Sequence, residues 1–409
     1  MAEIRRGRTR DVAREEHKSV VAKRLVKRYV SAVEMSTAND EEKASQEFAI
    51  DPARAVRAGE EIDLEKLRDY LANHLEGGAR QIAIEQFPGG HSNLTYLLRV
   101  DGRELVLRRP PFGNRVKSAH DMSREVTMLS ALAPVYPPAP KPLVNCEDDA
   151  VIGSPFYVME RMRGVILRRS LPKGVVVPPA KARQLSEAFV DNLVTLHAID
   201  WEKRGQDDLS RIAKPEGYVA RQIGGWTRRY ADAATDAIPD MESVGKWLAE
   251  KLPSAHPALE REQATVVHND YKFDNLVLAP DDLSHIVGVL DWEMATVGDP
   301  LMDLGVALGY WIESTDPDEM RSFAFGPTSI PGSFTRRQIV DRYAEKSGRD
   351  TSRMLFYFVF SLFKTAGVAQ QIYWRFKMGH TKDERFAAFL SGVHVLAQAA
   401  ARAIDRGKI

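Results

Sequence analysis

The residues with the clearest chemical meaning lie in one polar segment between two apolar runs. The segment reads His268-Asn269-Asp270-Tyr271-Lys272-Phe273-Asp274-Asn275. Transfer of a phosphoryl group needs a carboxylate that orients the attacking hydroxyl and, a short loop away, an oxygen ligand for magnesium. Asp270 suits the first role and Asn275 the second. We expect Lys272 to reach the transferred phosphate and His268 to brace the loop through hydrogen bonds.

A second acidic point follows the apolar run 287–290, which is typical of a buried strand. Asp291 comes directly after this run, where a carboxylate can serve as a second magnesium ligand beside the first loop. Glu293 is either a further or outer ligand or a salt-bridge partner. Of the next two acids, we expect Asp299 to cap a helix and Asp303 to hydrogen-bond the loop at 268–275.

A glycine-rich connection lies upstream, between two strand-like runs. Its central residues are Gly89, Gly90, Ser92 and Asn93. Such a connection alone also suits a hairpin. However, a basic residue on a strand and a glutamate on a helix follow it, and a glycine-rich loop, a basic residue and a glutamate together are typical of a site that binds nucleotide phosphates. Because Val106 and Arg108 share one strand face, we expect Arg108 rather than Arg109 to point inward, toward Glu125.

The elements that must position these residues change character along the chain. Short runs at 82–84, 95–100, 104–107, 150–152 and 156–159 predict a small antiparallel sheet, with helices at 62–75 and 118–133. After about residue 160 the pattern is mainly helical, with strands at 265–267, 276–278 and 286–290 and with helix throughout 353–405. We therefore predict an α+β fold of two lobes. Residues 62–160 form the nucleotide-binding lobe, and residues 161–409 form the helical lobe with the catalytic loop and substrate site.

Composition excludes several classes of protein. The chain has 409 residues with 57 basic and 57 acidic side chains, and this neutral balance argues against a globally basic nucleic-acid-binding protein. No uncharged apolar run reaches the roughly 18 residues of a membrane span. The single cysteine, Cys146, excludes an intramolecular disulfide framework and fits a reducing compartment, so we expect a cytoplasmic location.

Residues 1–61 differ from the rest of the chain. The first thirty residues hold ten Lys or Arg and four Asp or Glu, a net charge of +6. A helix is expected around 17–35, and residues 36–60 read as an acidic connector. This basic extension is either an arm that docks on an anionic surface or a solvated helix that packs on the body.

Together these residues resemble the aminoglycoside phosphotransferase family, which has a protein-kinase-like fold. The resemblance runs from about residue 62 to about residue 400. The family's loop usually reads His-Gly-Asp, and here Asn269 replaces the glycine with a residue that also tolerates unusual backbone angles. The resemblance implies ATP, with GTP not excluded, and Mg²⁺ as cofactors. It also implies that the backbone of a hinge at Glu160 and Met162 holds the adenine.

Further stretches resemble a narrower group, the kinase domain fused to some acyl-CoA dehydrogenases. They are residues 90–96, 107–111, 118–120, 221–226, 370–373 and 379–386. That group is associated with phosphorylation of hydroxyacyl-CoA thioesters, chiefly 4-hydroxyacyl-CoA, after which a dehydrogenase-like partner eliminates the phosphate. The resemblance thus implies an anionic CoA thioester as substrate and a partner enzyme of that kind. Monomer and homodimer both stay open.

Local charge and aromatic content bear on the substrate. Residues 160–181 carry six basic side chains against one acid, and residues 214–230 carry four against one. A basic lining suits a phosphate-bearing substrate, whereas a site for cationic aminoglycosides needs acids. These basic side chains can equally be solvated on the surface. Five aromatic residues could line a pocket for an acyl chain or could equally belong to the hydrophobic core: Trp226, Tyr230, Trp311, Tyr373 and Trp374. Two alternatives therefore remain, a phosphotransferase for aminoglycosides or other small alcohols and a nucleotide-binding pseudokinase scaffold.

Overall fold

The computed structural model describes most of the chain beyond the basic extension. The described residues are 52–88, 93–111, 122–169, 171, 176–202, 209–252, 257–381 and 384–409. The helix expected at 17–35 lies outside these residues, and so do Gly89, Gly90 and Ser92.

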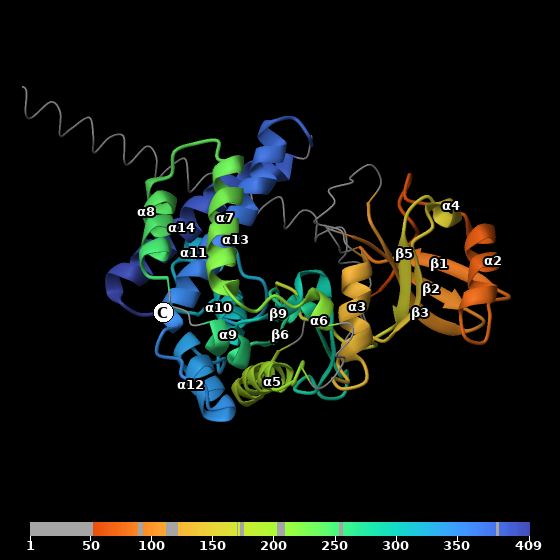
Figure 1. Cartoon of the computed structure of the whole chain (residues 1–409), viewed down its shortest axis with the longest axis horizontal. Coiled ribbons are helices and arrows are strands. Elements are labelled where there is room, and N and C mark those ends of the chain that lie inside the picture. The colour runs from red at the N-terminus through yellow and green to blue at the C-terminus, as the bar shows by residue number, and fades with distance from the viewer. Residues whose placement is uncertain are drawn as a thin grey trace, which may run out of the picture.

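A five-stranded antiparallel sheet forms the first lobe, on the right of Figure 1. Its order is β1-β2-β3-β5-β4, with β1 Ile82–Gln86, β2 Leu94–Val100, β3 Arg103–Arg109, β4 Pro142–Cys146 and β5 Phe156–Glu160. Asp101 and Gly102 join β2 to β3 with positive φ angles of 48° and 84°, as a two-residue Asp-Gly hairpin requires.

Alternation along β3 divides this sheet between two cores. Leu105 and Leu107 pack into a cluster with helix α2 (Leu64–His74), whereas Val106 packs into the large core of the molecule together with helix α3 (Met122–Leu132). Because successive side chains of a strand point to opposite faces, Arg108 lies on the same face as Val106. That face looks toward the helical lobe.

The strand predicted at 150–152 is wrong. These residues belong to the one-turn helix α4 (Asp149–Ile152), which Asp148 caps by accepting the Ala150 N–H and which Gly153 ends with φ of 82°. The neighbour of β5 in the sheet is β4, which was not predicted. A three-residue apolar run is compatible with both a strand and a helical turn. Here the flanking residues Asp148 and Gly153 favour the helical turn.

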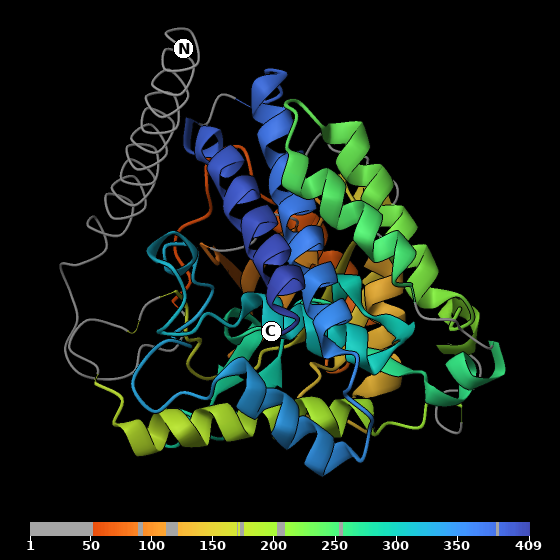
Figure 2. The same cartoon turned by 90° about the vertical axis from the view of Figure 1, so that its left-hand side faces the viewer.

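Helices make up most of the second lobe. They are α5 (Pro179–His197), α6 (Leu209–Ile212), α7 (Tyr218–Ala233), α8 (Pro239–Glu250), α9 (Pro257–Gln263), α10 (Pro300–Tyr310), α11 (Asp318–Arg321), α12 (Arg336–Ser347), α13 (Met354–Lys377) and α14 (Phe389–Arg406). Figure 2 shows α13 and α14 side by side, with α7 and α8 along one flank. The single helix predicted over 353–405 is two helices, because Gly379 with φ of 75° follows the end of α13 and a 3₁₀ helix, η3 (Glu384–Ala388), precedes α14.

One described segment, Glu384–Arg406, is long and apolar enough to cross a membrane by length and composition. That is weak support for a span, because the core helix of a soluble protein passes the same test. One side of α14 packs against α13 and α8. The absence of a membrane span stays a prediction.

Two short antiparallel strand pairs flank the polar segments. β6 (Thr265–Val267) pairs with β9 (Thr296–Gly298), and β7 (Leu276–Leu278) pairs with β8 (Ile286–Val289). Leu276 lies opposite Val289. Residue 275, just before β7, and residue 291, just after β8, are therefore brought to the same end of one hairpin.

α10 packs on α13 through a glycine, which gives a first testable prediction. A Cβ atom on Gly305 would lie 2.7 Å from the Cβ and the carbonyl oxygen of Tyr357. We expect Gly305→Ala to lower the free energy of unfolding in urea by about 1–3 kcal/mol, the usual cost of overpacking. Gly224 in α7 is the matched control, since its Cβ would meet nothing within 4 Å. Gly224→Ala should raise stability by about 0.5–1 kcal/mol. Equal effects at both sites would contradict the close packing of α10 on α13.

Candidate active site

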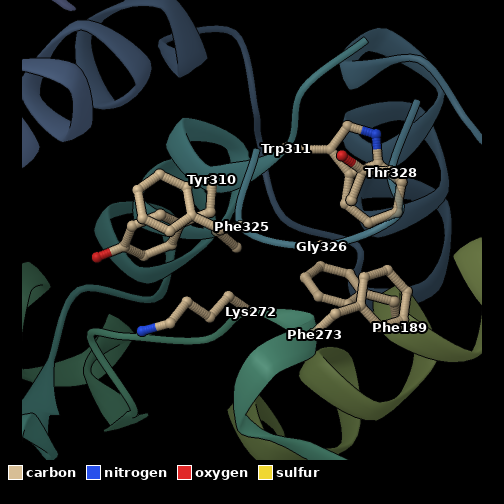
Figure 3. Close-up of a pocket in the computed structure, with 9 residues that line it drawn as sticks. Phe189, Lys272, Phe273, Tyr310, Trp311, Phe325, Gly326 and Thr328 are labelled. Carbon is tan, nitrogen blue, oxygen red and sulfur yellow. The ribbon is translucent and has the colours of Figure 1, made fainter. Parts of the chain in front are cut away.

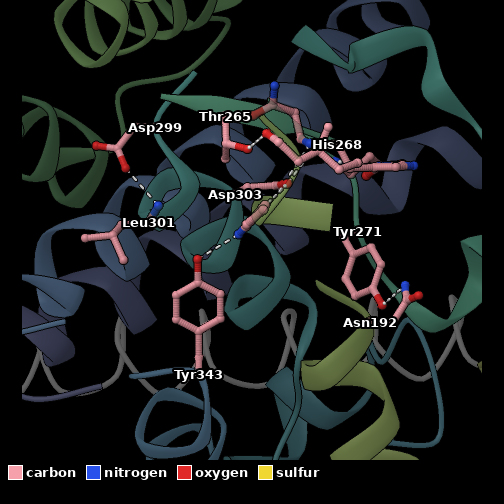
Figure 4. A network of polar contacts seen from close by, with 12 residues as sticks. Asn192, Thr265, His268, Tyr271, Asp299, Leu301, Asp303 and Tyr343 are labelled. Carbon is pink, nitrogen blue, oxygen red and sulfur yellow. Dashed lines mark hydrogen bonds and ion pairs between the residues drawn. The ribbon is translucent and has the colours of Figure 1, made fainter. Parts of the chain in front are cut away.

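Asp303 of α10 holds the catalytic loop, residues 268–275, through two backbone hydrogen bonds. Its carboxylate accepts the N–H of His268 at 2.6 Å and the N–H of Asn269 at 2.7 Å (Figure 4). Asn269 has φ of +63°, in the left-handed region that asparagine tolerates better than most residues. The hydrogen bonds expected from Asp303 are thus confirmed. Asp299 also caps α10 as expected, by accepting the Leu301 N–H at 2.8 Å.

Both ring nitrogens of His268 form hydrogen bonds with backbone groups. Its Nε2 lies 2.9 Å from the carbonyl oxygen of Leu290, and its Nδ1 lies 3.2 Å from the N–H of Asp270. These partners assign the proton to Nε2, and burial lowers the pKa of the ring below its ordinary value. A neutral ring with both nitrogens engaged braces the loop, in line with the role predicted for it.

Asp270 lies at the centre of the polar cluster. Its carboxylate forms an ion pair with Lys272, and the Asn275 side-chain amide donates to its Oδ2 at 2.9 Å and to its backbone oxygen at 2.8 Å. Burial acts to raise the pKa of Asp270, but the positive charges of Lys272 and Lys364 hold it below its usual range. The carboxylate is therefore ionised and can accept a proton or a hydrogen bond from an alcohol.

Two oxygen donors suitable for a divalent cation flank this cluster. Asn275 uses its amide nitrogen toward Asp270, which leaves its amide oxygen for another partner. Asp291, with φ of +67°, begins the 3₁₀ helix η2 (Trp292–Met294) at the same end of the hairpin. An amide oxygen and a carboxylate are hard ligands of the kind that Mg²⁺ takes together with substrate phosphates. Within the described residues no group of three or more His, Cys, Asp or Glu could hold a metal, and this donor set needs none.

Arg108 links the two lobes. It forms an ion pair with Glu125 of α3, and its second terminal nitrogen lies 2.9 Å from Oδ1 of Asp291. Burial acts to lower the pKa of Arg108, but the carboxylates of Glu125 and Asp291 hold it well above its usual value. Arg109, on the opposite face of β3, lies over the ring of Tyr96 instead. The inward orientation expected for Arg108 is present, and it delivers a fixed positive charge to the proposed metal ligand.

The predicted nucleotide-binding residues are only partly described. Asn93 is buried, and its amide nitrogen donates to Oε2 of Glu293 at 3.0 Å. Its amide oxygen has no hydrogen-bond partner among the described residues. Gly89, Gly90 and Ser92 lie outside the described residues. Asn93 therefore connects the end of the glycine-rich connection to the segment after Asp291.

The predicted hinge lies against the hairpin that carries the metal ligands. Glu160 ends β5, and its backbone N–H donates to the carbonyl oxygen of Lys141 at 2.9 Å. Met162 packs on β8, where a Cβ atom on Gly288 would come within 2.9 Å of the Met162 Cβ. A glycine at 288 thus lets the hinge approach this hairpin closely. The contact of Glu160 and Met162 with adenine stays a prediction.

Two residues near Asp270 were missed in the sequence. Tyr310 lies beside Lys272, whose Nζ is 5.0 Å from the centroid of its ring, and the polar ends of both side chains point the same way in Figure 3. Burial and the charge of Asp270 raise the pKa of Tyr310 well above its usual value, so its phenol is neutral. Lys364 of α13 donates to the Asn269 carbonyl oxygen at 2.6 Å. The signal that could have revealed Lys364 is a lone lysine inside the apolar run of α13.

Many of the basic residues counted toward the substrate site have carboxylate partners from other segments. Glu104 pairs with Arg161 at 2.8 Å and with Arg163 at 3.2 Å. Arg168 pairs with Asp274 and Lys181 with Asp282, at 3.1 Å and 3.5 Å. The positive charge of residues 160–181 is therefore partly compensated, and it supports an anionic substrate less than the sequence alone suggests.

The aromatic residues divide between core and surface. Trp226, Tyr230 and Trp311 are buried, whereas Tyr373 and Trp374 are partly exposed. Trp311 also lines the small pocket in Figure 3, which opens beside Lys272. The residues of this pocket are Phe189, Lys272, Phe273, Ala307, Tyr310, Trp311, Phe325, Gly326 and Thr328, with no acid among them. An apolar surface thus adjoins the catalytic loop.

Comparisons with known proteins identify the family of this chain. The sequence model of the phosphotransferase enzyme family, APH, matches residues 83–337, more than half of the chain. Acyl-CoA dehydrogenase family member 11 of Rattus norvegicus is 34% identical over 331 residues, which cover 79% of this chain and 41% of that protein. The chain thus spans less than half the length of this relative. The narrower resemblance to proteins named as acyl-CoA dehydrogenase family members is confirmed.

Solved structures share the fold. A provisionally named aminoglycoside phosphotransferase from Ralstonia eutropha JMP134 is 30% identical, with a TM-score of 0.68 over 84% of this chain and 99% of its own. A thermostable mutant of the aminoglycoside phosphotransferase APH(4)-Ia, in a ternary complex with ADP and hygromycin B, is 14% identical. It has a TM-score of 0.51 over 83% of this chain and 98% of its own, which shows the fold alone. The predicted bilobed, protein-kinase-like α+β fold is confirmed. This chain belongs to the phosphotransferase enzyme family.

Proposed function

We propose that the protein transfers the γ-phosphate of ATP, with Mg²⁺, to the hydroxyl of a hydroxyacyl-CoA thioester of the 4-hydroxyacyl type. The observation that carries the transfer chemistry is the ionised Asp270, held by Lys272 and Asn275 at the end of the hairpin that also carries Asp291. Phosphoryl transfer needs little covalent chemistry from the protein and depends on positioning and charge.

Each polar residue has a role in that transfer. Asp270 would accept the proton or hydrogen bond of the substrate hydroxyl and aim its oxygen at the phosphate. Lys272 and Arg108 would neutralise negative charge on the phosphates as it moves toward the bridging oxygen. Mg²⁺, held by Asn275 and Asp291, would supply further charge neutralisation and a fixed geometry. GTP is not distinguished from ATP by these groups.

The choice of acceptor rests on two observations. The relative that matches 79% of the chain is named as an acyl-CoA dehydrogenase family member. In addition, the side chains that line the cavity beside Lys272 include no acid, which disfavours a polycationic aminoglycoside at this position. The cavity itself, of about 10 Å³, is too small for an acyl chain. We further propose a cytoplasmic location and a dehydrogenase-like partner enzyme that consumes the phosphorylated product.

The test is a direct phosphorylation assay. Purified protein would be incubated with ATP, Mg²⁺ and 4-hydroxyvaleryl-CoA, and the products followed by ³¹P NMR and mass spectrometry. Parallel reactions would contain hygromycin B, choline or no acceptor. We expect phosphorylated 4-hydroxyvaleryl-CoA. Transfer to another alcohol alone would overturn the substrate, and nucleotide binding without transfer to any acceptor would favour a pseudokinase scaffold.

Removal of one proposed metal ligand gives a further prediction. Asp291→Asn keeps a residue that tolerates the observed φ of +67° but replaces a carboxylate by a neutral amide. We expect the Mg²⁺ concentration for half-maximal activity to rise by at least about tenfold. Asp281→Asn, at an exposed position between β7 and β8, is the control and should leave the Mg²⁺ dependence unchanged. An unchanged requirement in Asp291→Asn would remove Asp291 from the metal site.

A further inference from the structure

One buried cation reaches the catalytic loop from a helix almost one hundred residues farther along the chain. Lys364 lies in the middle of α13 with only 6% of its surface exposed. Its Nζ donates to the carbonyl oxygen of Asn269 at 2.6 Å, and it lies 5.8 Å from the centroid of the Trp226 ring. Asn269 directly precedes Asp270, so this hydrogen bond acts on the peptide that leads into the catalytic carboxylate.

Every polar group of Asn269 has a partner. Asp303 accepts its N–H, the Tyr218 hydroxyl donates to its side-chain oxygen at 2.9 Å, and its side-chain nitrogen donates to the carbonyl oxygen of Met294 at 3.0 Å. Lys364 satisfies the remaining group, the backbone carbonyl. The left-handed conformation at Asn269 is thus fixed from four sides. Among the described residues Lys364 is the donor to the Asn269 carbonyl, while the N–H of the same peptide, that of Asp270, donates to His268 Nδ1.

The charge of Lys364 is not needed for packing. Among the described residues it forms no ion pair with a carboxylate within 4.0 Å, although a buried ammonium without such a partner is costly. A methionine would fill similar space at lower cost. A charge retained at that cost next to Asp270 indicates a role in the chemistry of the loop.

We propose that Lys364 is a positioning residue that orients the Asn269 carbonyl and electrostatically stabilises the ionised form of Asp270, so that phosphoryl transfer depends on the protonated lysine. The proposal rests on the proposed function, because it assigns Lys364 to the same reaction. Lys364 itself touches neither the phosphates nor the acceptor in this scheme and acts through the loop.

The surroundings of Lys364 place its titration within reach of an assay. Burial lowers the pKa of Lys364 to about 8. The charged groups that face it are Asp270 and Lys272 on the loop, Asp303 on α10 and Arg229 on α7. The two carboxylates act to raise its pKa, and the two cations act to lower it. We therefore expect kcat of the wild-type protein to fall as pH rises through about 8, with the loss of this charge.

The first experiment compares kcat against pH for wild type, Lys364→Met and Lys364→Arg, with whichever acceptor the phosphorylation assay identifies. Lys364→Met should lower kcat by about 10²-fold, a typical result of a displaced catalytic group, with the KM for ATP little changed. Whatever its absolute rate, Lys364→Arg should lack the fall near pH 8, because a guanidinium stays charged. A wild-type rate in Lys364→Met, or the same alkaline fall in Lys364→Arg, would overturn the proposal.

The second measurement does not depend on turnover and so separates this proposal from the proposed function. The unfolded chain keeps the proton of Lys364 up to pH about 10.4, whereas the folded protein releases it near 8. As pH rises from about 8 to about 10.4, the folding equilibrium constant of wild type should therefore increase relative to that of Lys364→Arg, by about tenfold per pH unit. Lys346→Arg, at an exposed site on α12, is the control and should follow wild type. Parallel curves for wild type and Lys364→Arg would contradict the assigned titration.

Discussion

Replacing Asp270 by asparagine is expected to lower kcat by about 10²- to 10⁴-fold, the range typical of a lost general base. The carboxylate is ionised and lies between Lys272 and Asn275, and a neutral amide can neither take the proton of the hydroxyl nor orient it in the same way. The KM for ATP should change little, because the contacts proposed for the phosphates come from other side chains. Steady-state kinetics with the identified acceptor would measure both constants.

A neighbouring carboxylate provides the control for Asp270. Asp274 lies in the same loop but is partly exposed and pairs with Arg168 at 3.1 Å on the surface. Since such pairs contribute little, Asp274→Asn should keep kcat near the wild-type value. Asp274→Asn should unfold at the wild-type temperature, whereas Asp270→Asn should unfold at a lower one, because the charge that Lys272 and Lys364 stabilise is lost. The kinetic constants are therefore compared at a temperature at which both variants are folded. Wild-type kcat in Asp270→Asn would show that another group orients the acceptor and that the mechanism is wrong.

Residues whose positions depend on local spacing could be predicted from the sequence. The spacing of His268, Asp270 and Asn275 predicted that they meet in one loop, and the structure shows these contacts, whereas their catalytic and metal-binding roles stay predictions. Alternation along β3 correctly placed Arg108 rather than Arg109 on the inner face, because strand periodicity is a local property. The helix cap at Asp299 was equally local.

Contacts between distant segments could not be predicted in the same way. Lys364 reaches Asn269 across 95 positions of sequence, and no local pattern names the partner of a lone lysine in an apolar helix. Counting charge within residues 160–181 likewise overlooked Glu104, which lies in β3 and forms ion pairs with both Arg161 and Arg163. The net charge of a segment therefore does not give the charge around a site, because the fold places oppositely charged residues from other segments beside it.

Asp303→Asn is expected to lower the free energy of unfolding at neutral pH by about 2–4 kcal/mol, because buried donors lose the charged acceptor of their hydrogen bonds. Asp303 is fully buried and accepts the N–H groups of His268 and Asn269, and it also contacts Nε2 of His197 at 3.1 Å. The His197 ring in turn contacts the Tyr343 hydroxyl at 2.7 Å. An amide in place of the carboxylate would turn an N–H group toward backbone donors and leave at least one of them without an acceptor.

The pH dependence of that loss identifies the charge as its cause. Burial acts to raise the pKa of Asp303, but His197 and the loop hold it below its usual value. The stability that its charge contributes is therefore fully present above the unfolded pKa of about 3.9 and is lost as pH falls through the lower folded-state pKa. Urea unfolding should show a constant difference between wild type and Asp303→Asn near neutral pH, and a smaller one below pH about 4. Asp341→Asn, which breaks an exposed pair with Arg337, should cost no more than about 0.5 kcal/mol. A difference for Asp303→Asn that stayed constant into strong acid would mean that packing, and not the carboxylate charge, anchors the catalytic loop.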